Sequence, residues 1–437
     1  MSDRQDQPGP ADRLGEDPGP NRDDRVPAGG TDLRPATDDC YKCATCDTAC
    51  PVAEVDADFP GPKFQGPEQW RLERADDYAI DDSIEACSNC MRCDAACPAG
   101  VSLDRMHNTL RAEHVAARGF SRKAVRDRLL ANYGTLARVA SRVPRLANAV
   151  LGNRAVRWLN ERLLGITAER EFPAFATQTF RDWFRDRGGP TVQSAEKRVA
   201  YFHGDFANYN TPSVGRALVA VFEHFGYEVA VPDQRCSGTP MFANGYLEDA
   251  RRAARVNVRT LADLVADGYD VVCSCTSCSM ALRQEYPALF DLEGVDRVAA
   301  HTYEAVEYLR EREPLEDALA ETAVDDQALA YHAPCHARNQ GLAGQSPEVL
   351  APLDGATVTD VGDSCSGISG TYGWKAERYE TSMAVGEELF EELAAAPGET
   401  GLTECPTCAM QMEHGSGDPV RHPLEVIAEA LVGDPPR

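Results

Sequence analysis

Lysine is scarce in this 437-residue chain, while acidic residues are in large excess. Only five lysines occur, at positions 42, 63, 123, 197 and 375, and the formal net charge is −26. A protein needs a basic face to bind the phosphate backbone, so this balance argues against nucleic acid as a general partner. An acidic, lysine-poor surface is typical of a protein that stays hydrated in a halophile-like, salt-rich cytoplasm.

Long apolar runs and nucleotide-binding signatures are also missing. No apolar stretch approaches the roughly 18 residues that a membrane-spanning helix needs, and residues 1–36 contain no apolar segment typical of a signal peptide. The sequence has no GxGxxG, no P-loop and no Ser-His-Asp arrangement, so we expect substrate chemistry to belong to a partner. These absences predict a cytoplasmic protein that does not cross a bilayer.

Composition and pattern divide the chain into five segments. Residues 1–36, rich in Pro, Gly, Asp and Arg, are predicted to be a disordered acidic tail. A cysteine-rich ferredoxin-type domain is expected at 37–118, followed by a basic amphipathic helical connector at 119–190. Two cysteine-rich lobes are expected at 197–312 and 327–432.

Sixteen cysteines are present, and eight of them form two runs near the N-terminus. Disulfide scaffolds are short secreted domains, so cysteines in a long chain without a signal peptide are better explained as metal ligands. Both runs have the bacterial ferredoxin spacing Cys-x2-Cys-x2-Cys-x3-Cys-Pro. The first run is Cys40, Cys43, Cys46 and Cys50, and the second is Cys87, Cys90, Cys93 and Cys97.

This spacing predicts two [4Fe–4S] clusters with crossed ligands. Three closely spaced thiolates wrap around three iron corners, while the fourth, followed by proline, points toward another cluster. The expected sets are Cys40, Cys43, Cys46 and Cys97 for cluster 1, and Cys87, Cys90, Cys93 and Cys50 for cluster 2. Zinc sites or disulfides remain alternatives, although a Cys-Pro has no role in a zinc ribbon. The 36-residue insert between the runs favours a helical ferredoxin-like module that passes single electrons.

The C-terminal half is an internal repeat with an offset of 129 to 130 residues. Cys236-Ser237-Gly238 recurs as Cys365-Ser366-Gly367, and Cys275-x-x-Cys278 recurs as Cys405-x-x-Cys408. Short apolar strands alternate with helices, which indicates parallel sheets. Strands are predicted at 199–202, 229–231, 271–273, 328–331 and 357–361, and helices at 248–266 and 376–395. The predicted fold class is α+α/β: a helical two-cluster module followed by two tandem α/β lobes.

Each lobe carries candidate metal ligands. The second lobe offers four cysteines, enough for a further iron–sulfur centre or for zinc: Cys335, Cys365, Cys405 and Cys408. The first lobe offers Cys236, Cys275 and Cys278, with Cys273 nearby and Asp205 in the place of Cys335. An oxygen ligand is unusual for an iron–sulfur cluster, so a metal centre is less well supported there. The alternative is buried free thiols.

Four histidines lie near these motifs: His203, His332, His336 and His414. Each is either a ligand or proton carrier, or a structural histidine with satisfied hydrogen bonds. Trp70, Trp374 and the turn at 370–373 are expected to serve packing and chain reversal rather than cofactor contact.

Residues 111–187 reverse the charge of the chain. This segment contains sixteen Arg or Lys and seven Asp or Glu, and the basic excess coincides with amphipathic patterning. The apolar members are Trp158, Leu159, Leu163 and Leu164, beside Arg154, Arg157 and Arg162. Basic amphipathic helices with Trp lie on anionic membrane surfaces. A solvated linker or a docking face for an acidic partner subunit are the alternatives.

Seven stretches carry a resemblance to a known family: 179–184, 199–204, 208–210, 243–245, 281–287, 331–336 and 367–373. With the order of two ferredoxin runs and two cysteine-rich lobes, they resemble the iron–sulfur subunits of anaerobic glycerol-3-phosphate dehydrogenases. The lobes are similar to the Cys…Cys-Cys-Gly…Cys-x-x-Cys domains of heterodisulfide reductases and glycolate oxidase subunits. The chain departs from that pattern at Asp205, Ser237 and Ser366, which puts the special cluster of these lobes in doubt.

The resemblance implies an electron-transfer subunit rather than a catalyst. In that family a flavoprotein subunit oxidises sn-glycerol 3-phosphate to dihydroxyacetone phosphate, and the iron–sulfur subunit passes the electrons to membrane quinone. It therefore implies a hetero-oligomer, peripheral on the inner face of the cell membrane. The alternatives are an iron–sulfur subunit for a glycolate, lactate or disulfide-reducing complex, and a non-redox zinc scaffold.

Overall fold

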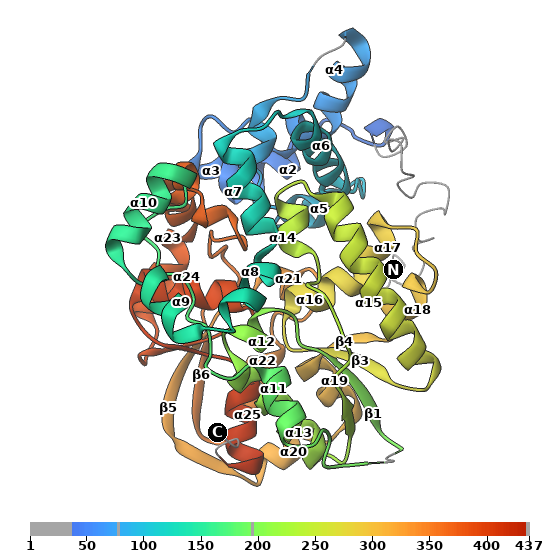
Figure 1. Ribbon diagram of the computed structural model, residues 1–437, viewed down its shortest axis with the longest axis vertical. Coiled ribbons are helices and arrows are strands. Elements are labelled where there is room, and N and C mark those ends of the chain that lie inside the picture. The colour runs from blue at the N-terminus through green and yellow to red at the C-terminus, as the bar shows by residue number, and fades with distance from the viewer. Residues whose placement is uncertain (1–36, 77–78, 194–195, 434–437) are drawn as a thin grey trace, which may run out of the picture.

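The computed structural model describes residues 37–76, 79–193 and 196–433; the predicted disordered tail lies outside them. Between residues 37 and 118 the described chain forms helices joined by loops, as expected for a helical module (Figure 1). They are α2 (Thr45–Thr48), α3 (Pro51–Val55), the π-helix η3 (Phe64–Glu68), α4 (Gln69–Asp76), the 3₁₀-helix η4 (Asp82–Ala86), α5 (Arg92–Ala96) and α6 (Leu103–Ala117).

The connector is a set of short helices, and the last of them packs on the first lobe. They are α7 (Arg122–Ala131), α8 (Tyr133–Ala140), α9 (Pro144–Leu151), α10 (Arg154–Leu164) and α11 (Phe180–Asp186). Pro144 begins α9 because its missing N–H is not needed in the first turn of a helix. None of the helices in the described residues is long and apolar enough to span a bilayer.

An ion pair joins the connector to the second lobe. Arg126 of α7 is buried, and two of its guanidinium nitrogens donate to Glu377 at 2.6 and 2.8 Å. Its third nitrogen, Nε, donates to Asp127 at 2.9 Å. A bidentate guanidinium pair fixes orientation as well as distance, so α7 is held in register on the second lobe.

Each lobe contains one four-stranded parallel sheet, and the two sheets have the same strand order. The first sheet, ordered β2-β1-β3-β4, comprises β1 (Arg198–Phe202), β2 (Glu228–Ala230), β3 (Asp270–Cys273) and β4 (Thr302–Glu304). The second, ordered β6-β5-β7-β8, comprises β5 (Ala323–Tyr331), β6 (Asp354–Asp360), β7 (Thr400–Leu402) and β8 (Val420–Arg421). The equal order shows that the sequence repeat is a repeat of structure.

Helices flank both sheets. In the first lobe they are α12 (Phe206–Tyr209), α13 (Pro212–His224), α14 (Thr239–Ala243), α15 (Leu247–Ala266), α16 (Thr276–Met280), the π-helix η5 (Ala281–Glu285), α17 (Tyr286–Leu289), α18 (Val295–Ala300) and α19 (Ala305–Arg312). In the second they are α20 (Leu315–Ala320), α21 (Cys335–Arg338), α22 (Gln345–Leu350), the 3₁₀-helices η6 (Tyr372–Trp374) and η7 (Ala376–Arg378), α23 (Tyr379–Ala395), α24 (Pro406–Ser416) and α25 (Pro423–Val432).

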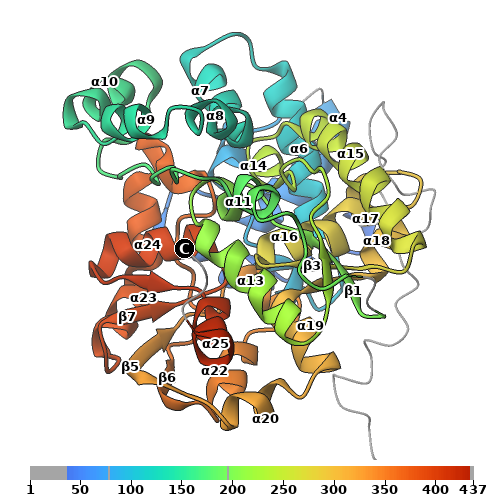
Figure 2. The ribbon, with the colours of Figure 1, turned by 60° about the horizontal axis from the view of Figure 1, so that its bottom comes forward.

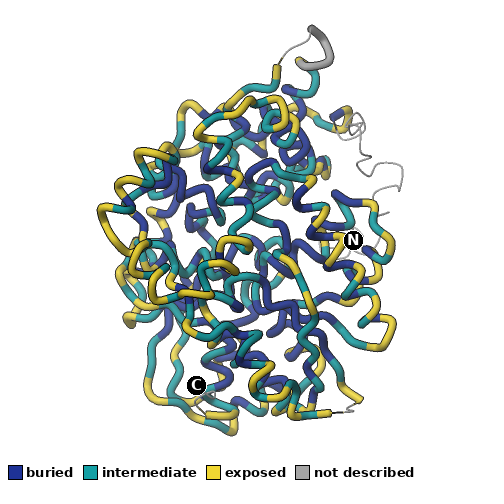
Figure 3. The backbone as a smooth tube through the Cα atoms, in the orientation of Figure 1, coloured by how far each residue is buried: buried dark blue, intermediate teal, exposed yellow. Residues whose placement is uncertain are grey.

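The lobes share one hydrophobic core. Helix α13 of the first lobe packs along α25, the last helix of the chain, between the two sheets (Figures 1 and 2). Phe222 of α13, Ile427 of α25 and Tyr331 of β5 belong to the same buried cluster. Each such side chain contributes roughly 1.5–3 kcal/mol by burial. The shared core therefore fixes how the two sheets face each other, and Figure 3 shows buried backbone running through both lobes. The domain limits predicted from the sequence stay predictions.

Candidate iron–sulfur sites and the cavity between the lobes

Two small hollows lie in the N-terminal module, and their cysteines match the two predicted sets. One hollow is lined by Cys40, Cys43, Cys46 and Cys97. The other is lined by Cys87, Cys90, Cys93 and Cys50. Each hollow thus takes three cysteines from one run and the fourth from the other. All sixteen cysteines are free thiols, which leaves every one of them available as a ligand.

The two cysteine loops have the same unusual backbone. Lys42 and Ala44 adopt left-handed conformations with φ of 59° and 64°, and Asn89 and Met91 do so with φ of 56° and 61°. These positions occupy equivalent places between the first three cysteines of each run. Non-glycine residues pay about 1–2 kcal/mol for this conformation, so it persists only where the surroundings require it. Here it turns successive cysteines toward one centre, as a cluster requires.

The second hollow is buried and has positive charge beside it. Burial raises the pKa of Cys50 to about 12, since a thiolate is poorly solvated there. Burial also opposes ionisation of Cys87, yet the Arg111 guanidinium and the His107 ring hold the pKa of this thiol at about 6. A coordinating thiol is deprotonated by its metal, so iron would offset the burial penalty at Cys50. The donor set fits a cluster with four thiolate ligands.

The two hollows differ in what lies outside them. At the first, Cys43 is exposed and Tyr41 keeps 77% of its surface in solvent. At the second, the side-chain amide of Asn339 donates to the Cys90 carbonyl at 3.2 Å, and Cys87 packs in one apolar cluster with Cys365 of the second lobe. The first hollow therefore lies near the surface, and the second lies against the second lobe.

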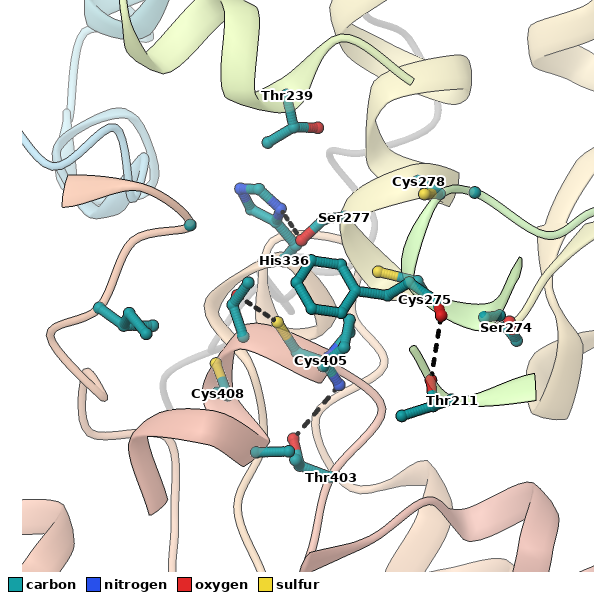
Figure 4. A pocket seen from close by; sticks show the side chains of 18 of the residues that line it. Thr211, Thr239, Ser274, Cys275, Ser277, Cys278, His336, Thr403, Cys405 and Cys408 are labelled. Atoms are coloured by element: carbon teal, nitrogen blue, oxygen red, sulfur yellow. Dashed lines mark hydrogen bonds between the residues drawn. The ribbon is translucent and has the colours of Figure 1, made fainter. Parts of the chain in front are cut away.

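A cavity of about 330 Å³ lies between the lobes and collects the remaining predicted cysteines (Figure 4). The carboxyl ends of parallel strands point to one edge, which is where ligands bind in open α/β sheets. Both edges face this cavity: Cys275 precedes α16 directly after β3, and Cys405 precedes α24 directly after β7. The lining cysteines are Cys236, Cys275 and Cys278 from the first lobe, Cys335, Cys365, Cys405 and Cys408 from the second, and Cys90 from the ferredoxin-type module.

The cysteines of the second lobe form an electrostatically coupled set. A hydrogen bond from Cys408 lowers the pKa of Cys405 to about 6, while the same contact raises the pKa of Cys408. Burial raises the pKa of Cys335, and the charge of Cys365 raises it further. No group of three or more His, Cys, Asp or Glu in the described residues is spaced for a single metal ion. A four-iron cluster spreads its ligands farther apart than one ion does.

The serines that replace the second cysteine of each Cys-Cys-Gly contact the last cysteine of their own lobe. The Ser366 hydroxyl donates to Cys408 Sγ at 3.3 Å, and Ser237 Oγ lies 3.6 Å from Cys278 Sγ. In both lobes, serine thus stands where the Cys-Cys-Gly pattern has its second cysteine, and its hydroxyl forms a hydrogen bond with the last cysteine of the lobe. A hydrogen bond to a ligand sulfur tunes the reduction potential of an iron–sulfur centre.

The first lobe brings an incomplete set to the cavity. Asp205 lines it with Cys236; burial raises the pKa of this carboxyl to about 6, against a hydrogen bond from Cys236. Cys273, in contrast, is fully buried in the apolar core beneath β1 and α15 and does not line the cavity. Three cysteines and a carboxyl make a poorer match to a four-thiolate site than the second lobe.

The predicted histidines divide into two groups. His203, His332 and His336 line the cavity between the lobes, whereas His414 lies outside its lining and contacts the Tyr379 hydroxyl at 3.0 Å. The sequence interpretation missed His422, which caps α25 and contacts the Ser274 carbonyl at 2.7 Å across the lobe interface. Its signal was the His-Pro-x-Glu pattern before an apolar helix, which is a capping box.

Comparisons with known proteins agree with this arrangement. Residues 36–101 match the family described as 4Fe-4S dicluster domain, and residues 199–283 and 329–413 each match the family described as Cysteine-rich domain. The N-terminal module is thus a [4Fe–4S]-binding module, and the chain is an iron–sulfur protein of electron transfer.

Three relatives show how far the likeness extends. A subunit of the anaerobic glycerol-3-phosphate dehydrogenase of Escherichia coli K12 is 33% identical over 396 residues, which cover 90% of this chain and 98% of the relative. Lactate utilization protein A of an Exiguobacterium species is 30% identical over 53% of this chain and 98% of its own length. A subunit of the fumarate reductase (CoM/CoB) of Methanothermobacter marburgensis is 28% identical over 55% of this chain and 48% of its own length.

The first of these relatives spans the cysteine runs, the connector and both lobes. Its similarity and the order of the matched modules show that this chain belongs to the family of iron–sulfur subunits of anaerobic glycerol-3-phosphate dehydrogenase, within the cysteine-rich-domain iron–sulfur proteins.

Proposed function

We propose that this chain is an electron-transfer subunit that carries two [4Fe–4S] clusters with crossed ligands. Cys40, Cys43, Cys46 and Cys97 hold cluster 1, and Cys87, Cys90, Cys93 and Cys50 hold cluster 2. The observation that carries the proposal is the pair of hollows, each lined by one of these sets. A cluster of this type accepts and releases one electron at a time.

The positions of the hollows give the electron path a direction. Tyr41 and Cys43 leave the first site open to a docking partner, so electrons enter there. The second site faces Cys365 across a shared apolar cluster, so it is the exit toward the second lobe. The chain sets the distances and excludes water; the redox chemistry belongs to the cofactors.

We further propose that Cys335, Cys365, Cys405 and Cys408 hold a third centre, an iron–sulfur cluster, with zinc as the weaker alternative because these cysteines are not spaced for a single ion. Burial in one cavity and mutual effects on their pKa values support it. In the first lobe Asp205 and Ser237 break the ligand pattern, so Cys236, Cys275 and Cys278 are proposed as metal ligands only as the weaker alternative.

The donor in this proposal is the flavoprotein subunit of a glycerol-3-phosphate dehydrogenase, and the acceptor is membrane quinone. The E. coli relative supports this choice, since it matches 90% of the chain, whereas the lactate-utilization and fumarate-reductase relatives match about half. The complex is a hetero-oligomer that docks on the inner face of the cell membrane. A subunit of a glycolate, lactate or disulfide-reducing complex would use the same sites with another donor.

Exposed apolar side chains on α8, α9 and α10 form the proposed membrane contact, which we name the connector ridge. Its members are Leu136, Val139, Val143, Leu146, Val150, Trp158, Leu159 and Leu163. Four arginines, from α8, the turn after it and α11, line a hollow beside these helices: Arg138, Arg142, Arg181 and Arg185. Basic residues beside exposed apolar ones suit an anionic lipid surface.

Iron and acid-labile sulfide per chain, measured on anaerobically purified protein, test the proposal. We expect about eight irons from two cubanes, visible absorption that dithionite bleaches, and additional iron if the second lobe holds a cluster. The double variant Cys405→Ser/Cys408→Ser should lose only that additional iron. Colourless protein that contains zinc would contradict the electron-transfer role and leave the zinc scaffold.

A further inference from the structure

The end of the interlobe cavity that lies in the first lobe has an aromatic wall. The Tyr133 ring of α8 stacks on the Phe206 ring of α12, with centroids 5.4 Å apart and planes at 16°. Tyr133 also stacks on Phe175, with centroids 6.4 Å apart and planes at 17°. Tyr133 and Phe206 line the cavity together with Ala207, Val214 and Ala243. A flat, apolar ring matches such a wall.

Two buried imidazoles, one from each lobe, line the same cavity with an unpartnered nitrogen. His203 contacts the Gly204 carbonyl through Nδ1 at 2.6 Å, and its Nε2 has no hydrogen-bond partner among the described residues. His336 contacts Ser277 Oγ through Nδ1 at 2.8 Å, and its Nε2 likewise lacks a partner among the described residues (Figure 4). Buried polar atoms without a partner point to a ligand that satisfies them.

The partners of the two rings decide what each can offer. A carbonyl can only accept, so His203 Nδ1 carries the hydrogen and Nε2 is a bare acceptor. Burial lowers the pKa of His203 to about 4, which keeps this ring neutral at pH 7. Ser277 can donate or accept, so His336 can present its Nε2 either as a donor or as an acceptor.

The charged groups of the cavity disfavour an anionic ligand. Arg421 is engaged, since it donates to Glu429 and to Gln327, each at 2.7 Å. Glu425 accepts from the backbone of His422 at 3.0 Å. Asp205 interacts with Cys236, while its Oδ2 has no hydrogen-bond partner among the described residues. An anion would meet this carboxyl without a free guanidinium, so an uncharged ligand with oxygen atoms on opposite edges of a planar ring fits better than an anion.

Helix α8 contributes to both the cavity wall and the connector ridge. Tyr133 opens α8, and Leu136 and Val139 of the same helix are exposed members of that ridge. The cavity wall is thus one helix away from the surface that is proposed to touch lipid.

We propose that the first-lobe half of this cavity binds the head group of a lipid-soluble quinone and of its hydroquinone. The ring lies against Tyr133 and Phe206; His336 Nε2 donates to a quinone carbonyl, and a hydroquinone hydroxyl donates to His203 Nε2. This inference rests on the proposed function, because it names where the acceptor of that function binds.

Equilibrium dialysis of the intact, anaerobically purified chain with 2,3-dimethyl-1,4-naphthoquinone tests the site without an activity assay. We expect saturable binding, which the cavity-filling Ala243→Trp weakens at least tenfold. Ala320→Trp, the same change at an exposed end of α20, should leave it unchanged. His203→Phe should weaken hydroquinone binding about fivefold, the effect of one lost hydrogen bond, and His203→Gln should restore part of it.

Three outcomes overturn the inference. One is binding that Ala243→Trp and His203→Phe leave intact. Another is equally tight binding of 2,3-dimethylnaphthalene, which has the ring but not the oxygens. The third is the absence of quinone binding. If the wild-type chain keeps its bleachable absorption and reduces a dye but binds no quinone, the inference fails and the proposed electron transfer stands. Quinone binding by colourless protein would instead support the binding site and contradict the proposed electron transfer.

Discussion

The side-chain amide of Asn339 in the second lobe donates a hydrogen bond to the backbone carbonyl of Cys90 at 3.2 Å. These residues are 249 positions apart in the chain, and the contact holds the second cysteine loop against the second lobe. Arg92 adds an ion pair to Asp363 at 3.8 Å, and the Ser369 hydroxyl donates to the Ser88 carbonyl. The loop is therefore seated by polar contacts on both sides of Cys90.

Asn339→Ala should weaken the contact between the second cysteine loop and the second lobe, and it should change the surroundings of the second site. We expect a loss of about 1 kcal/mol in unfolding free energy from one hydrogen bond. We also expect a shifted midpoint potential for the second site alone, since water gains access and potentials follow solvent exposure. A redox titration followed by EPR measures both sites.

Asn153→Ala is the matched control. Asn153 caps α10 through the Ala155 and Val156 amides, far from the cysteine loops in sequence, and its loss costs a similar amount of stability. If Asn339→Ala and Asn153→Ala shift the midpoint potential of the second site equally, the contact with the second lobe does not tune that potential.

The crossed pairing predicts which cysteine variants resemble each other. Cys97→Ser and Cys43→Ser should abolish the same EPR signal, because both line the first hollow. Cys50→Ser and Cys87→Ser should abolish the other, because both line the second. If each run instead holds its own cluster, Cys97→Ser will match Cys87→Ser, and Cys50→Ser will match Cys43→Ser.

The elements that can be predicted from the sequence are those whose pattern is local and strong. The five predicted strands lie within a few residues of β1, β2, β3, β5 and β6, and the repeat offset requires a second sheet like the first. The strands β4, β7 and β8 have only two or three residues each, too few to show a hydrophobic alternation. The cysteine spacing predicts which thiols share a hollow because ligand geometry constrains the spacing directly.

Long-range packing cannot be predicted in the same way. The apolar faces of α13 and α25 show that each helix needs a partner, but any complementary face would satisfy that need. Their mutual packing, which fuses two lobes into one core, follows only from the full topology. Single polar contacts such as Asn339 to Cys90 have no sequence signature, so the packing of the second cysteine loop on the second lobe cannot be predicted.

The burial of Glu285 predicts that the unfolding free energy falls as the pH rises. It is buried in η5 and neither carboxyl oxygen has a partner among the described residues. Burial, with the nearby charge of Asp104, raises the pKa of this carboxyl to about 8. The folded state thus binds a proton that the unfolded state has released above pH about 4.3. The contribution of Glu285 to the unfolding free energy is therefore complete below pH about 4.3. It is lost as the pH rises toward 8, by at most about 1.4 kcal/mol per pH unit.

Glu285→Gln should remove the part of the slope that comes from Glu285, because an amide stays neutral at every pH. Glu304 and Glu404, whose pKa values burial raises to about 8 and about 7, keep their own parts. Chemical unfolding at pH 5.5 and pH 8 measures the slope, and the exposed Glu293→Gln in the same lobe serves as the control. An unchanged difference between the two pH values in Glu285→Gln would assign the pH dependence to other groups.

The connector ridge predicts binding to anionic vesicles in two separable parts. Leu146, at 63% exposure the most exposed residue of the ridge, should insert into the lipid interface, while the arginines of α8 and α11 attract anionic head groups. Of the α11 arginines, Arg181 pairs with Asp233 and Arg185 pairs with Asp182, so Arg138 and Arg142 carry most of this attraction. Salt screens only the second part, since the Debye length is about 8 Å at physiological ionic strength. Cosedimentation with phosphatidylglycerol vesicles should therefore weaken with salt but not vanish. Leu146→Glu should abolish the salt-resistant part, whereas Val256→Glu on α15 of the first lobe should not. Complete release of the wild-type chain by salt would instead favour an acidic partner subunit as the occupant of this surface, because such docking depends on charge alone.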